Sequence, residues 1–138
     1  MELKAMGSNI PIRQDAVFSE IDYGVDENRP EAEVEARIGR EALDRWNREA
    51  IPPEGWNVDV AEIEAGWRRF AAAVGGSGKT VMVVTSNGIA RFALRLVEED
   101  DRPEGMDIKL ATGAYGVLVF RNGRWFVESW NVKLKDIL

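Results

Sequence analysis

The stretch TVMVVTSNGIARFAL, residues 80–94, limits the possible folds of this chain more than any other part of its sequence. Its first six residues form an unbroken apolar run rich in β-branched side chains, which is typical of a strand covered on both faces. After Gly88, apolar residues recur at helical spacing. The stretch therefore predicts a buried strand, a corner at residues 86–88 and a helix, an arrangement at which α/β proteins often bind ligands.

The rest of the sequence predicts further helices and strands around this unit. A helix is expected over about residues 30–50, where apolar residues lie at steps of four, and a second over residues 59–74, where Asp59 begins it and Gly75 ends it. Strands are expected over residues 106–111, 115–120 and 124–132, with a tight hairpin turn at residues 122–123. Together these elements indicate one α/β domain over residues 1–138.

The composition argues against several kinds of binding partner and against a membrane or secreted location. The 138 residues carry a net charge of −6, and the acidic and basic side chains are mixed along the chain. Nucleic acids and anionic membranes are therefore poor partners. No apolar run reaches the roughly 20 residues of a membrane-spanning helix, and the N-terminal sequence lacks the apolar centre of a signal peptide. We expect a cytoplasmic protein.

The absence of histidine and cysteine limits the chemistry further. A Ser-His-Asp triad, a His-ligated zinc site and a phosphohistidine all require a side chain that this sequence does not contain. Thiolate nucleophiles and disulfides are excluded in the same way. We expect neither a metal site nor a cofactor.

Two motifs have a structural interpretation as well as a functional one. The run GGSGKT, residues 75–80, is similar to part of a phosphate-binding loop, but it follows a predicted helix and precedes a predicted strand, so a surface turn is favoured. Ser86 is a good helix N-cap, and as a nucleophile it would lack both a histidine and the first glycine of a hydrolase elbow, where Val84 stands. Between these, the backbone amides of Asn87 and Gly88 could hold a phosphate.

Five segments, in the same order, resemble the C-terminal half or more of the histidine phosphatase superfamily, which includes the phosphoglycerate mutases. They are FSEIDYG (18–24), EALDRWNREA (41–50), DVAEIEAGWRRFAAAV (59–74), TVMVVTSNGIARFAL (80–94) and WFVESWNVKL (125–134). The resemblance covers about residues 11–135, and its most specific points are EIDYG and the strand–corner–helix that contains Arg91.

The resemblance implies a fold: a truncated, phosphoglycerate mutase-like three-layer sandwich with a core of parallel strands and a C-terminal antiparallel hairpin. Members of the family carry an Arg-His-Gly motif on an N-terminal strand, followed by a second arginine, and neither has a counterpart in this sequence. In the family that strand lies in the middle of the sheet, so we expect residues 80–85 to keep an unpaired edge and a bare apolar face. A homodimer that completes the sheet is the expected remedy.

The resemblance also implies which residues remain of the family's site. Glu20 matches the glutamate that donates a proton to the leaving group, and Ser86 stands where the family has a second catalytic histidine. We therefore expect a non-catalytic protein, a pseudophosphatase. Any remaining affinity for phosphate or a phosphorylated ligand would be weak and would rest on Ser86, Asn87, Gly88 and Arg91.

Two alternatives stay open at the level of sequence. The chain could be part of a phosphatase or mutase whose missing strand and histidines come from another chain, which an Arg-His-Gly strand encoded by the neighbouring upstream reading frame would favour. It could also be an altered or incomplete gene product without a function of its own.

Overall fold

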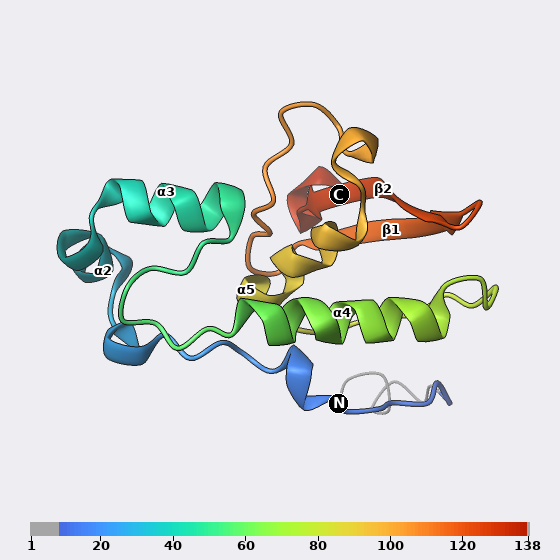
Figure 1. Cartoon of the computed structure of the whole chain (residues 1–138), viewed down its shortest axis with the longest axis horizontal. Helices are drawn as coiled ribbons and strands as arrows, with labels where there is room; N and C mark the ends of the chain where they lie inside the picture. Colours follow the sequence, from blue (N-terminus) through green and yellow to red (C-terminus); the bar gives the residue numbers. More distant parts are fainter. Residues whose placement is uncertain (1–8, 138) are drawn as a thin grey trace.

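Four α-helices and one β-hairpin make up the regular structure of residues 9–137, the part of the chain that the computed structural model describes. Figure 1 shows α2 and α3 at one end of the molecule and the hairpin at the other, with α5 between them and α4 running alongside α5 and the hairpin. The bounds are α2 (Glu31–Ile38), α3 (Arg40–Glu49), α4 (Val60–Val74), α5 (Asn87–Ala90), β1 (Tyr115–Arg121) and β2 (Arg124–Val132).

The helix expected over residues 30–50 is two helices, so the prediction of one continuous element was wrong. Gly39 separates α2 from α3 with a φ of 86° and a ψ of 157°. Glycine reaches positive φ without a steric penalty, and this conformation cannot continue a helix. The apolar stripe predicted at steps of four is partly confirmed: Val34, Trp46 and Ala50 are buried, whereas Ile38 and Ala42 are half-buried. Leu43, which lies outside that stripe, is also buried.

The second helix, α4, agrees with its prediction. Asp59 caps it by accepting a hydrogen bond from the backbone N–H of Glu62 (3.0 Å), and Gly75 follows its last residue. Its buried face includes Ile63, Trp67 and Ala71. The indole of Trp67 donates a hydrogen bond to the carbonyl oxygen of Ile89 (3.1 Å), which fixes α4 against α5.

The predicted parallel strand core and three-layer sandwich are absent from the described residues, which contain only the antiparallel sheet of β1 and β2. Residues 80–85 and 106–111 are not strands. A strand is defined by pairing with a neighbour, and no segment of the described chain lies in a position to pair with either. The only parallel contact in residues 9–137 is a single bridge between Val97 and Trp125.

The C-terminal hairpin forms as the sequence predicts. Asn122 and Gly123 take φ values of 52° and 75°, and positive φ at both central residues is the signature of a two-residue hairpin turn. Arg121 then lies opposite Arg124, and Leu118 lies opposite Val127.

The core lies where α3, α4, α5 and the hairpin meet. Its centre is Phe92, which is fully buried on η3 (Arg91–Leu96), the 3₁₀ helix that continues directly from α5. The other buried members of the cluster are Ile21, Trp46, Ala50, Ile63, Trp67, Ile89, Ala93, Leu94 and Ile108.

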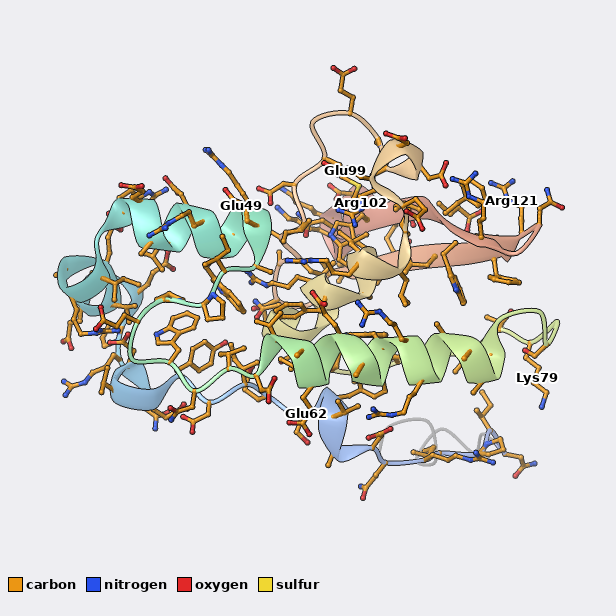
Figure 2. All side chains as sticks on the ribbon, in the orientation of Figure 1. Glu49, Glu62, Lys79, Glu99, Arg102 and Arg121 are labelled. Carbon is orange, nitrogen blue, oxygen red and sulfur yellow. The ribbon has the colours of Figure 1, made fainter. Side chains whose placement is uncertain are left out.

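The loop after α4 is a surface turn, which is the interpretation favoured for the GGSGKT run. Gly76 and Gly78 have positive φ, and Ser77 accepts a hydrogen bond from the backbone N–H of Lys79. Figure 2 shows Lys79 extending outward beyond the end of α4. No helix of the described chain has the length and apolar character needed to cross a membrane.

A close contact between α4 and η1 (Ala16–Phe18) gives a test of this packing. A Cβ on Gly66 would lie 2.3 Å from a methyl carbon of Val17. We therefore expect Gly66→Ala to lower the free energy of unfolding by about 1–3 kcal/mol, although alanine is the better helix former. Urea unfolding measures the change.

The matched control is the same substitution in a Val17→Ala background. There the obstructing methyl groups are gone, so Gly66→Ala should become neutral or stabilising by up to about 1 kcal/mol. Equal effects of Gly66→Ala in the two backgrounds would contradict the packing described.

Candidate functional site

Glu20 and the corner at residues 86–88 lie together although they are far apart in the sequence. A Cβ on Gly88 would lie 3.3 Å from Oε1 of Glu20 and 3.1 Å from Cδ1 of Ile21. The hydroxyl of Thr85 donates a hydrogen bond to the carbonyl oxygen of Phe18 and so fixes the corner to the segment that carries Glu20. A side chain at position 88 would make a tight contact with this segment, so the side chains of Glu20 and Ile21 would have to shift by a few tenths of an ångström.

The carboxylate of Glu20 is held by its own segment. Oε1 accepts hydrogen bonds from the backbone N–H of Ile21 (2.9 Å) and from the hydroxyl of Tyr23 (3.4 Å). The residue is exposed. Its carboxylate is therefore accessible to solvent and to a ligand at the corner.

Ser86 is the N-cap of α5. Its Oγ accepts a hydrogen bond from the backbone N–H of Ile89 (3.4 Å), and its carbonyl oxygen accepts one from the N–H of Ala90 (2.9 Å). The hydroxyl thus satisfies a donor that would otherwise be free at the start of the helix. Within the described residues no basic side chain contacts this hydroxyl, so nothing is placed to remove its proton.

Arg91 lies in the interior, with an exposed fraction of 4%. Its guanidinium lies 4.2 Å from the ring centroid of Trp46, donates to the carbonyl oxygen of Trp46 (2.9 Å) and donates through Nε to that of Asn87 (3.3 Å). Burial lowers the pKa of Arg91 to about 10, so the side chain is still protonated at neutral pH. Its contacts join the end of α3 to α5.

Asn87 contributes its backbone to the corner. Its carbonyl oxygen accepts hydrogen bonds from both the backbone N–H and the Nε of Arg91. Across the part of the chain that the structure describes, its side-chain amide has no hydrogen-bond partner. Of the residues predicted to bind a ligand, Ser86, Asn87 and Gly88 lie at the corner beside Glu20, and Arg91 is turned into the core.

Sequence reasoning did not single out Tyr23, which lies next to Glu20. Its ring packs edge-on against Trp56 (centroids 4.8 Å apart), which in turn packs against Trp46 (5.3 Å). Burial and then the charge of Glu20 raise the pKa of Tyr23 to about 12. The EIDYG motif contains this tyrosine, so the motif was the available signal.

An ion pair between the buried Asp26 and the exposed Arg37 also escaped prediction. Asp26 accepts two hydrogen bonds from the guanidinium of Arg37, one of them from Nε at 2.8 Å, and a third from the indole of Trp56 at 2.8 Å. The hydrogen bonds from Arg37 lower the pKa of Asp26 below its ordinary value. The three side chains come from separate segments, and no local sequence pattern indicates that they meet.

The charges around the corner set what the site can do chemically. Glu20 places a negative charge beside Gly88, while the nearest guanidinium, that of Arg91, is buried against Trp46. In residues 9–137 no group of three or more acidic side chains is arranged to hold a metal ion. The arrangement therefore presents an exposed carboxylate at the corner, whereas the guanidinium of Arg91 is buried and does not face a phosphate there.

Comparison with known proteins identifies the family. The sequence profile of the histidine phosphatase superfamily (branch 1) matches residues 1–133, nearly the whole chain. The chain belongs to the histidine phosphatase superfamily.

One curated protein that is similar to this chain is the 2,3-bisphosphoglycerate-dependent phosphoglycerate mutase of Methanosarcina mazei. It is 24% identical over 125 residues, which cover 87% of this chain and 52% of that protein. The chain thus spans about half the length of the curated relative that it matches. No solved structure matches the chain.

Superfamily membership confirms the resemblance read from the sequence. The two positions that the resemblance implies for the site, Glu20 and Ser86, are brought to the same corner by the fold. The resemblance includes Tyr23 within EIDYG but assigned no role to it, nor to Asp26 or Arg37, and the contacts of these residues became visible only in the structure.

The capping role of Ser86 can be measured. We expect Ser86→Ala to lower the free energy of unfolding by about 1 kcal/mol, because the N–H of Ile89 loses its acceptor. Ser86→Thr keeps a hydroxyl and is the control, with a smaller loss. Equal losses for alanine and threonine in chemical denaturation would contradict a capping role.

The pKa of Tyr23 gives a pH dependence. The phenol ionises near pH 10 in the unfolded chain but only at about pH 12 in the folded protein, so its contribution to stability is complete below pH 10 and is lost between pH 10 and 12. The stability of Tyr23→Phe should decline less over this range, measured by urea unfolding. An identical decline in the two proteins would refute the assignment.

Proposed function

We propose that this chain is a non-catalytic histidine phosphatase-like protein, a pseudophosphatase. The observation that carries the proposal is the make-up of the corner: Glu20 lies beside Gly88, and the position that the family resemblance gives to a catalytic histidine holds Ser86, used as a helix cap. The 138 residues contain no histidine, so no phosphohistidine can form on them.

Electrostatics supports the same conclusion. Phosphoryl transfer depends on a nucleophile and on positive charge aimed at the transferring group. The guanidinium of Arg91 instead donates to the carbonyl oxygens of Trp46 and Asn87. Glu20 by itself is an acid, and it supplies neither the nucleophile nor the positive charge.

The remaining role in this proposal is weak binding of phosphate or a phosphorylated ligand at the backbone amides of Asn87 and Gly88, with Arg91 behind them. Backbone N–H groups that open a helix attract anions. The negative charge of Glu20 and the net charge of −6 oppose that attraction. Affinity should therefore be low and should rise when Glu20 is neutralised.

A second candidate function follows from length. Because the chain spans about half of the mutase of Methanosarcina mazei, it could be one part of an enzyme that another chain completes. In that case the other chain would supply the nucleophile and the cations, and Glu20 would act as the acid. The discriminating observation is whether activity appears when the upstream-encoded polypeptide is added.

We expect the purified chain to hydrolyse p-nitrophenyl phosphate at no more than the background rate.

In a phosphate titration followed by NMR, the backbone amide resonances of residues 86–89 should shift. In Glu20→Gln they should shift at lower phosphate concentration, because the substitution removes a repelling charge without a change of shape. Glu99→Gln, the same change at an exposed glutamate on η4 (Glu99–Asp101), is the control.

Other results would redirect the proposal. Hydrolysis above background that Glu20→Gln abolishes would show an enzyme and contradict the pseudophosphatase. An absence of shifts at residues 86–89 in both proteins would remove the binding role and leave Ser86 as a cap alone.

A further inference from the structure

Residues 80–85 form an extended segment whose backbone pairs with no other segment of the described chain. It connects the loop after α4 to the cap of α5. Among the described residues, the backbone N–H and C=O groups of these six have no hydrogen-bond partner, and only the side chain of Thr85 is bonded, to the carbonyl oxygen of Phe18. A row of free donors and acceptors of this kind is a template for a further strand.

The side chains of this segment alternate as they do in a strand. Val83 and Thr85 face the protein, where Val83 packs against the core cluster and Thr85 contacts the segment of Phe18. Met82 and Val84 face outward, with exposed fractions of 69% and 81%. The segment therefore has one attached face, one bare apolar face and free edges between them.

The segment also lacks the features that protect exposed strand edges. Natural edges carry charged residues, proline or bulges that discourage pairing. Residues 80–86 contain no charged residue and no proline. A chain with a net charge of −6 thus presents one uncharged strand at which two copies can approach without direct repulsion.

We propose that a second copy of this chain pairs with residues 80–85 as an antiparallel strand across a two-fold axis centred on Val83. The argument is self-complementarity. In such a pair, residues directly opposite each other lie on the same face of the sheet. Centring on Val83 places Met82 opposite the partner subunit's Val84, and Val84 opposite the partner subunit's Met82, all four on the outward face.

Neighbouring registers fit less well. Centring the axis on Met82 would place the outward Val84 opposite the partner subunit's Thr80, and centring it on Val84 would place the outward Met82 opposite the partner subunit's Ser86. Only the register centred on Val83 places both outward apolar side chains of each copy, Met82 and Val84, opposite apolar side chains of the partner. Cross-strand apolar contacts and backbone hydrogen bonds then act together.

The dimer goes beyond the proposed function and does not rest on it. Pairing at residues 80–85 uses the strand that leads into Ser86 but none of the groups at the corner. A result on phosphate binding or hydrolysis therefore leaves the dimer untouched, and a result on the dimer leaves the pseudophosphatase untouched.

Solution mass across a dilution series tests the proposal. We expect the purified chain to be a dimer by light scattering, and Val84→Lys to weaken the dimer at least about tenfold, because each lysine would face an apolar side chain of the partner. The control is Leu134→Lys, which changes an apolar residue of similar exposure (62%) on η5 (Leu134–Asp136) and should leave the dimer intact. Circular dichroism establishes that both variants are folded.

Cysteine cross-linking tests the register and stays decisive if Val84→Lys does not fold. The chain has no cysteine, so Met82→Cys and Val84→Cys each carry a single thiol. Opposite Cα atoms in the proposed pair lie about 4.5–5.5 Å apart, within disulfide reach, whereas like positions lie beyond it. A mixture of the two variants should therefore form the mixed disulfide faster than either disulfide with itself.

Three results would overturn the proposal. The first is a chain that stays monomeric at every concentration. This result counts against the proposal even if a different polypeptide, once added, pairs with residues 80–85. The second is a dimer that Val84→Lys and Leu134→Lys weaken equally. The third is a mixed disulfide that forms no faster than the two symmetric ones.

Discussion

The buried guanidinium of Arg91 is the contact on which the rest of the structure depends. It lies over the ring of Trp46 and donates to the carbonyl oxygen of that same residue, at the end of α3. A charge in the interior is tolerated only where such contacts replace its hydration. Arg91 therefore ties the first half of the chain, α2 and α3, to the short α5 and to the 3₁₀ helix that carries Phe92.

From Trp46 a series of ring contacts leads to the candidate site. Trp46 packs against Trp56, and Trp56 packs against Tyr23, whose hydroxyl donates to Glu20. Removal of any ring in this series would leave a cavity of aromatic size. The position of Glu20 beside Gly88 thus depends on packing that begins in the core.

The corner keeps the geometry of a site while its charges suit a structural role. The hydroxyl of Ser86 caps α5, and the guanidinium of Arg91 braces α5 against α3, so both of these side chains are engaged within the protein. Glu20 is the exception, because its carboxylate is exposed to solvent. Ser86 and Arg91 are thus used for structure, and only the carboxylate of Glu20 faces solvent. This arrangement is the physical basis of the proposed loss of catalysis.

Sequence by itself determined the elements whose signals are local. The capped helix α4, the stripe that buries Val34 and Trp46, and the hairpin turn at Asn122 and Gly123 follow from residues close together in the chain. The family follows from several such segments that occur in a fixed order. Each depends on propensity, spacing or turn chemistry, which act over a few residues.

Only the tertiary structure decided what depends on distant partners. An apolar run such as residues 80–85 has the propensity of a strand, but a strand requires a neighbour, and the described chain provides none. In the same way, no local pattern predicts that Arg37 and Trp56 both donate hydrogen bonds to the buried Asp26, or that Glu20 lies against Gly88. Pairing and burial are properties of two segments at once, which is why one segment's sequence could not predict them.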